Sequence, residues 1–299
     1  SSYIPYIMTQ FPNLKNTFKG FEFYENTVSF GSHTVLGASA MMGGYEYTPD
    51  AMNEQPERLL VDKHNEALKV LPQLFGKNGF ETNFIGIPLP NYREWDLSVF
   101  DGADYFKIGP NKNYVAQYKK QAKENFGNYS DSDLCNKNAK EFSILQILYP
   151  PVRVTFYNEG KYYSEFRENV STSFLKEYAG LFFLKDIYDC DATDNTFTFI
   201  QNNATHEYTY LLGVDFKPGI PDSESALSNT GIYEPVSNES LGIVNDKYGY
   251  FVNASAFIQI GKFLESLKAN GVYDNSRIII VSDHGSLMNT FRFKDFKNG

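Results

Sequence analysis

The end of the chain constrains the fold most, because a helix pattern there leads at once into a short apolar run. Across residues 251–270 apolar side chains recur every three or four positions, which predicts an amphipathic helix, and Gly271 is typical of a helix end. The run 277–281 that follows, Arg277 and then four β-branched residues, predicts a strand covered on both faces. A helix followed by a buried strand indicates a parallel α/β sheet.

Asp283 and His284 follow the carboxyl end of this predicted strand, in the sequence Ser282-Asp283-His284-Gly285. Open α/β sheets bind their ligands outside the carboxyl ends of the strands. An adjacent carboxylate and imidazole suit manganese or zinc better than calcium or magnesium, so we expect Asp283 and His284 to be metal ligands. Asp-His-Gly is also a common loop tripeptide, and taken alone the pattern leaves both interpretations open.

The same helix-then-strand order occurs earlier in the chain. Residues 59–77 predict an amphipathic helix that stops at Gly79, and residues 80–87 predict the strand after it. Further predicted elements are helices at 34–42, 111–126 and 171–183, strands at 152–157 and 196–201, and a long surface segment at 217–247. With 299 residues the chain can bury one large α/β core, and we expect one domain over residues 1–299.

Hydroxyl groups crowd the start of the helix predicted at 34–42. A hydroxyl there lies in the positive potential of the helix N-terminus, which favours its ionised form and any phosphate attached to it. Thr34 is therefore a candidate nucleophile, although Ser32 or Thr34 acting only as a helix cap explains the same pattern. His33 adjoins Thr34 and fits a supporting role, and His64 falls on the polar side of its helix, where we expect it to be structural.

Composition excludes some functions and leaves others open. The net charge is −9 and no run of Lys or Arg stands out, which argues against nucleic acid as a partner. Aromatic residues make up 16% of the chain, which suits contacts with sugars or lipid headgroups but equally suits an aromatic core. Sequence alone does not say whether Cys135 and Cys190 pair.

The run from Gly261 to Gly285 closely resembles the metal-site segment of the sulfatase-like branch of the alkaline phosphatase superfamily. Weaker similarity covers nearly the whole chain, notably at 43–49, 63–72 and 202–206. Within the superfamily the chain looks most like lipoteichoic acid synthases and lipid A phosphoethanolamine transferases. The resemblance implies a mostly parallel central sheet with helices on both faces.

For the nucleophile, the resemblance implies Thr34, which would also contact the metal. In phosphoethanolamine transferases the nucleophilic threonine follows Cys-Gly-Thr-x and precedes Pro-Cys-Met. Here Phe30-Gly-Ser-His precedes Thr34 and Ser39-Ala-Met follows, so those cysteines and the proline are missing. True sulfatases instead carry Cys/Ser-x-Pro/Ala-x-Arg, and no such motif occurs in this sequence. That omission favours phosphoryl transfer over sulfate-ester hydrolysis.

The resemblance also implies a substrate pocket. His206 matches a family histidine that faces the phosphate or leaving group as a general acid, and Asn203 lies in the same motif. Arg93 and Trp95 follow the strand at 80–87, where related enzymes contact the headgroup, although order and spacing differ and a surface ion pair explains Arg93 equally well.

Together these implications predict a metal-dependent phosphotransferase at the extracytoplasmic face of a bacterial cell membrane, with an anionic lipid or glycan as substrate. We expect the first sheet strand, its acidic metal ligand, the membrane anchor and a C-terminal part of the sheet to lie outside this chain. Glu22 and Glu25 follow no strand, so neither replaces that ligand, and we expect the chain alone to be inactive. Two rival interpretations stay open: a sulfate- or phosphate-ester hydrolase, and a degenerate polysaccharide-binding domain.

Overall fold

The computed structural model describes residues 3–25, 27–93, 97–101, 106–108, 114–126, 139–140, 142–157, 171–207, 209, 211–213, 215–219 and 247–285, and of residues 106–108, 124, 247 and 248 the backbone alone. Its elements are, in order, α1 (Tyr3–Gln10), α2 (Pro12–Thr17), α3 (Thr34–Gly43), η1 (Tyr45–Tyr47), α4 (Pro49–Asn53), α5 (Leu60–Lys77), β1 (Glu81–Ile85), η2 (Pro90–Tyr92), η3 (Leu97–Phe100), β2 (Phe106–Ile108), α6 (Val115–Gln121), α7 (Lys123–Phe126), α9 (Pro150–Tyr157), α10 (Thr172–Phe182), α11 (Leu184–Ile187), β3 (Thr196–Ile200), η5 (Ala204–His206), α13 (Lys247–Ala269) and η6 (Tyr273–Asn275).

The sheet of the described residues has the strand order β2-β1-β3, and both pairings are parallel. In β1, Glu81 pairs with Thr196 and Ile85 with Ile200, so β1 and β3 end at the same edge. The backbone N–H of Gln201 continues the ladder by donating to the carbonyl of Ile85 at 2.8 Å. The parallel sheet predicted from the helix-then-strand order is therefore confirmed, with β1 at its centre.

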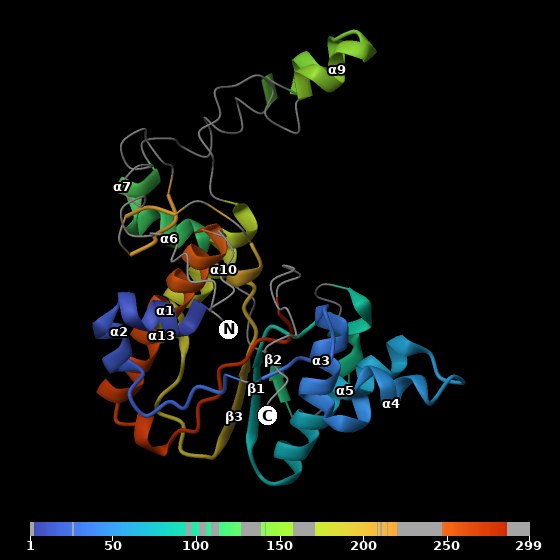
Figure 1. Ribbon diagram of the computed structural model, residues 1–299, viewed down its shortest axis with the longest axis vertical. Coiled ribbons are helices and arrows are strands. Elements are labelled where there is room, and N and C mark those ends of the chain that lie inside the picture. Colours follow the sequence, from blue (N-terminus) through green and yellow to red (C-terminus); the bar gives the residue numbers. More distant parts are fainter. Residues whose placement is uncertain are drawn as a thin grey trace, which may run out of the picture.

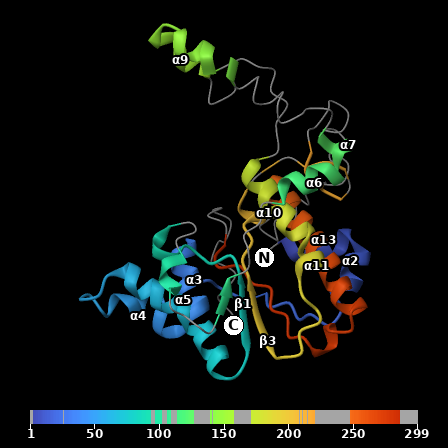
Figure 2. The same ribbon diagram turned by 180° about the vertical axis from the view of Figure 1, so that it is seen from behind.

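Helices cover both faces of this sheet, as Figures 1 and 2 show, with α3 and α5 on one side and α10 and α13 on the other. On the α3/α5 side, Phe84 of β1 is fully buried and packs with Met42 and Leu68. A larger cluster on the opposite side is built from α1, α2, α10 and α13 and includes Phe174, Tyr178, Phe251 and Leu264. Alternate side chains of a strand point to opposite faces, so β1 and β3 contribute to both clusters.

Most helix predictions are confirmed within one to four residues. α13 spans the predicted 251–270 helix and ends at Gly271, whose φ of 71° is the left-handed conformation expected at a helix end. The N-cap of α10 is Ser171, which accepts a hydrogen bond from the backbone N–H of Phe174. α6 and α7 replace the single helix predicted at 111–126.

Two strand predictions are wrong. Residues 152–157 lie in the helix α9, which begins at Pro150 and Pro151, because proline favours the first turn of a helix. Residues 277–281 are extended but belong to no strand of the described sheet, and Ile279 is 77% exposed. A β-branched run is buried only where neighbouring strands and helices cover it, and in the described part of the chain none of them does so here.

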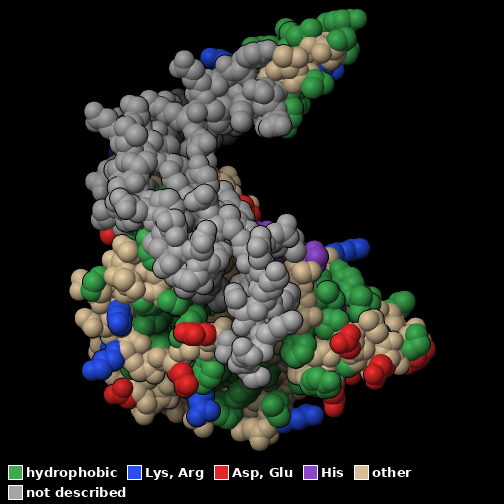
Figure 3. Space-filling view, viewed as in Figure 1, with side chains coloured by type: hydrophobic (Ala, Val, Ile, Leu, Met, Phe, Trp, Pro, Cys, Tyr) green, Lys and Arg blue, Asp and Glu red, His purple; other side chains and the backbone are tan. Residues whose placement is uncertain are grey.

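Surface features agree with the composition. Figure 3 shows charged side chains of both signs scattered over the described residues of one face, which form no continuous basic area there. Among the helices that the structure describes, none is both long and apolar enough to span a bilayer. Cys190 is partly buried, and the other cysteine, Cys135, lies outside the described residues, as does most of the surface segment predicted at 217–247.

Candidate active site

Thr34 occupies the first position of α3, directly after the N-cap residue His33. Its hydroxyl oxygen Oγ1 lies 3.5 Å from Nε2 of His284, a residue 250 positions later in the sequence. The His33 ring shares a 2.8 Å hydrogen bond with Ser32 Oγ through Nδ1. The structure thus brings the predicted nucleophile and one predicted metal ligand together at the positive end of a helix.

Hydrogen bonds fix the His284 ring in one tautomer. Nδ1 lies 2.7 Å from the carbonyl oxygen of Gly285, which can only accept, so Nδ1 carries the proton. In the neutral ring Nε2 then has the lone pair, and this atom lies 3.5 Å from the Thr34 hydroxyl and 3.9 Å from Asp283 Oδ2. The other Asp283 oxygen, Oδ1, accepts from the backbone N–H of His284 at 3.0 Å.

The side chains that meet here are of types that bind metal ions. Histidine ligands of metals usually donate their second ring N–H to a carbonyl or carboxylate, as Nδ1 does here. Thr34 Oγ1, His284 Nε2 and Asp283 Oδ2 form a mixed oxygen and nitrogen donor set that suits zinc or manganese. Among the residues that the structure describes, no third His, Cys, Asp or Glu joins Asp283 and His284. The residues present therefore fit a divalent ion as part of its ligand shell.

Gly37 explains how the two segments approach so closely. It lies three residues after Thr34, so both residues face the same side of α3. A Cβ atom built at Gly37 would lie 2.0 Å from the backbone oxygen of Asp283, which is a collision with main chain. Only glycine lets the Asp283 backbone rest on the first turn of α3. Sequence reasoning missed this residue, although a glycine inside a short helix was the available signal.

His206 and Asn203 lie beyond the carboxyl end of β3, in and just before η5. Their turn is anchored to α10: Asn202 Nδ2 donates to the Glu177 carbonyl at 2.9 Å, and the Asn203 N–H donates to Glu177 Oε2 at 3.1 Å. The His206 side chain is exposed. No hydrogen bond between described residues joins it to Thr34 or His284, so its role in the same site stays a prediction.

The other predicted pocket residues follow β1. Arg93 is exposed and comes directly after η2, whereas Trp95 lies outside the described residues. This loop is held by Asn91, which bonds Asn65 of α5 through both its backbone N–H and its side chain. Sequence reasoning also missed Asn65, because its partner is 26 residues away.

His64 differs from its predicted position. It is fully buried rather than on the polar side of α5, because its ring finds polar partners inside: Ser39 Oγ lies 2.7 Å from Nδ1, and the carbonyls of Pro88 and Leu89 lie 3.2 and 3.1 Å from Nε2. Burial lowers the pKa of His64. Its predicted structural role agrees with these contacts.

Comparison with known families agrees with this fold and site. The sulfatase family model matches residues 1–298, so the chain belongs to the sulfatase family. A search of curated proteins found no match, and neither did a search of solved structures.

Membership confirms the predicted sulfatase-like branch of the alkaline phosphatase superfamily and the α/β fold of that branch. The family comprises sulfatase-like enzymes, both hydrolases and transferases, which generally use divalent metal ions. The chain is accordingly a sulfatase-like enzyme domain.

Proposed function

We propose that this protein is a metal-dependent phosphotransferase that acts on a phosphodiester lipid headgroup, of the phosphoglycerol or phosphoethanolamine type, with Thr34 as nucleophile. The observation that carries the proposal is the 3.5 Å approach of Thr34 Oγ1 to His284 Nε2 at the N-terminus of α3. The lack of any Cys/Ser-x-Pro/Ala-x-Arg motif supports transfer of a phosphoryl group over sulfatase chemistry. Resemblance to lipoteichoic acid synthases and lipid A phosphoethanolamine transferases supports the headgroup.

The reaction has two displacements at phosphorus. In the first, the Thr34 oxygen bonds to phosphorus, its proton leaves to solvent, and the bond from phosphorus to the lipid oxygen breaks. The leaving oxygen takes a proton from His206, acting as general acid. In the second, an acceptor hydroxyl attacks the phosphothreonine, His206 takes the proton from that hydroxyl, and the Thr34 oxygen is released and reprotonated from solvent.

Asp283, His284 and Thr34 would hold the divalent ion, manganese or zinc. When bound there, such an ion supplies a Lewis acid that lowers the pKa of a coordinated hydroxyl and stabilises charge on the phosphoryl oxygens. The N-terminus of α3 adds to this, because its partial positive charge favours an anionic group on Thr34.

Arg93, Trp95 and Asn203 are the proposed contacts for the headgroup, which is an anionic lipid or a glycan phosphate. A guanidinium such as that of Arg93 binds a phosphate through two parallel hydrogen bonds. The resemblance supports a position at the extracytoplasmic face of a bacterial membrane.

Intact-mass and peptide mass spectrometry of the full-length protein tests the nucleophile. After incubation with vesicles that contain phosphatidylglycerol or phosphatidylethanolamine, we expect a glycerophosphoryl or phosphoethanolamine adduct on Thr34. Thr34→Ala should carry none, and Thr34→Ser should still react because it keeps a hydroxyl at the helix start. Release of sulfate or phosphate from simple esters by an enzyme that never carries such an adduct would assign a hydrolase instead.

Metal analysis of the same protein tests the ion. We expect a chelator to abolish the adduct and manganese or zinc to restore it. Asp283→Asn and His284→Ala should each lower metal content after dialysis. Full metal content in both variants would place the ion elsewhere.

A further inference from the structure

The loop after β1 holds an unusual backbone conformation. Leu89, Asn91 and Tyr92 have φ values of 44°, 52° and 58°, in the left-handed region that residues other than glycine rarely occupy. Asn tolerates this region well, but Leu and Tyr do not. Such a conformation persists only where surrounding contacts hold it, and it is concentrated at functional sites.

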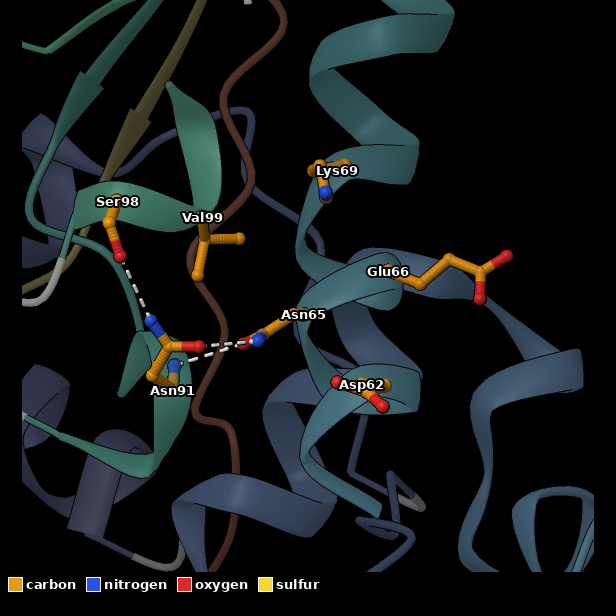
Figure 4. Close-up of a pocket in the computed structure, with 7 residues that line it drawn as sticks. All are labelled: Asp62, Asn65, Glu66, Lys69, Asn91, Ser98 and Val99. Atoms are coloured by element: carbon orange, nitrogen blue, oxygen red, sulfur yellow. Dashed lines mark hydrogen bonds between the residues drawn. The ribbon is translucent and has the colours of Figure 1, made fainter. Parts of the chain in front are cut away.

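Asn65 of α5 supplies one set of these contacts. Its Oδ1 accepts from the backbone N–H of Asn91 at 2.9 Å, and its Nδ2 donates to Asn91 Oδ1 at 2.6 Å. Asn91 Nδ2 in turn donates to Ser98 Oγ at 3.2 Å. Figure 4 shows Asn91 bonded to Ser98 on one side and to Asn65 on the other, with Asn65 reaching from the helix across to the loop.

His64, the neighbour of Asn65, supplies a second set. Because the Pro88 and Leu89 carbonyls can only accept, His64 Nε2 carries a proton and donates to them. On its other side the ring bonds Ser39, which belongs to α3, the helix that begins at Thr34. The ring of Tyr92 packs on the same imidazole at a centroid distance of 5.3 Å.

These contacts connect the loop to the helix of the nucleophile. The loop leaves the carboxyl end of the central strand β1, the edge at which α/β proteins bind ligands, and it leads directly into Arg93. In the described part of the chain, neither Asn65 nor His64 contacts Thr34 or His284 through a hydrogen bond. Their effect on a bound headgroup must therefore pass through the loop.

We propose that Asn65 and His64 are positioning residues that hold the loop 88–93 in its left-handed form, so that it is a preformed wall of the phosphodiester pocket at a fixed distance from α3. This inference rests on the proposed function for its substrate. A preformed wall spares the binding step the entropy of ordering the loop, so its loss weakens binding of the headgroup more than it slows the chemical step.

Asn65→Ala in the full-length protein tests the proposal in two ways. Amide hydrogen exchange of residues 91–93 should accelerate by about tenfold. This is the effect expected when the lost contacts contribute about the net free energy of one hydrogen bond. In the Thr34 labelling assay, the phosphatidylglycerol or phosphatidylethanolamine concentration for half-maximal rate should rise by about tenfold, while the rate at saturating lipid changes by less than about threefold.

Two further variants control for a general folding defect. Asn65→Asp keeps the acceptor for the Asn91 N–H, so it should restore most of the exchange protection. Lys77→Ala changes an exposed side chain in the last turn of α5, further along the helix from Asn65, and should match the wild type in both measurements.

The exchange measurement separates this inference from the proposed function, because it needs no substrate. Unchanged exchange at residues 91–93 in Asn65→Ala overturns the positioning role, whatever the substrate proves to be. The positioning role is also overturned if the labelling rate at saturating lipid falls by as large a factor as the lipid concentration for half-maximal rate rises. If the wild type is never labelled at Thr34 but the exchange result holds, the proposed function fails and the positioning role stands for another ligand.

Discussion

Burial of the His64 ring makes the stability of the protein depend on pH. The lowered pKa means that folded His64 stays neutral below the ordinary value of about 6.5, at which the unfolded chain takes up a proton. The unfolded state therefore binds more protons in that interval, and the free energy of unfolding falls as pH drops from about 6.5 toward the folded pKa. Denaturant unfolding at pH 7.5, 6.0 and 5.0 should show this fall.

His64→Gln should unfold with a weaker dependence on pH over the same interval, because it removes the titrating ring and keeps an amide donor. His33→Gln is the matched control, since His33 is exposed and, among described residues, its side chain bonds only its neighbour Ser32. An identical pH profile for His64→Gln and the wild type would contradict the assignment.

His206 is the predicted general acid, and its replacement should affect chemistry alone. His206→Ala should lower turnover by about 10²- to 10⁴-fold, the usual contribution of a positioned acid or base. Metal content after dialysis should equal that of the wild type, because His206 is not among the proposed ligands. A matching loss of metal would make His206 a ligand instead.

At the scale of single residues, the sequence indicated candidates with distinctive chemical groups. It did not indicate residues that act by allowing a close backbone approach or by pairing with a distant side chain. Asp283, His284 and Thr34 stood out as a carboxylate, an imidazole and a hydroxyl at element ends, and the structure places Thr34 against His284. Gly37 and Asn65 act through a backbone approach and a paired amide, and each needs a partner that is distant in sequence. Local pattern does not reveal such partners.

At the scale of elements, the close approach of α3 to the segment 282–285 should be sensitive to a single methyl group. Gly37→Ala would place Cβ against the Asp283 oxygen and force the two segments apart. Because a displacement of about 1 Å can cost about 100-fold in rate, we expect turnover to fall by about that factor. The labelling rate at Thr34 measures this fall.

Gly180→Ala is the matched control for this substitution. Gly180 also lies inside a helix, α10, but an added Cβ would meet nothing nearer than Asn202 Nδ2 at 4.0 Å. It should keep the wild-type rate. Equal rates for Gly37→Ala and the wild type would show that the contact with Asp283 does not set the geometry of the site.

Element prediction succeeded where the pattern and the local signals agreed. α13 and α10 have both an apolar period and clear ends, at Gly271 and Ser171 respectively. It failed at 152–157 and 277–281, where short β-branched runs carry no information on whether a neighbouring strand is present. The strands β1 and β3, by contrast, lie beside each other and pair. A short stretch of sequence does not show whether such a neighbour is present.

At the scale of the whole molecule, the sheet stands between two apolar clusters of unequal size. The smaller contains Met42, Leu68 and Phe84, and it supports α3 and α5, on which Thr34 and Asn65 lie. The larger contains Leu264 and supports α10 and α13. Since β1 and β3 contribute side chains to both, we expect the two clusters to unfold together, as the prediction of one domain over residues 1–299 requires.

Leu68→Ala and Leu264→Ala test this cooperativity, because each leucine is fully buried in a different cluster. Each substitution should lower the free energy of unfolding by about 2–5 kcal/mol, through lost burial and an unfilled cavity. In calorimetry both should shift the same single transition to lower temperature, because loss of either cluster removes one side of the shared sheet. Two transitions, one moved by Leu68→Ala and the other by Leu264→Ala, would instead divide the chain into two domains, with Thr34 and Leu264 on different sides of the boundary.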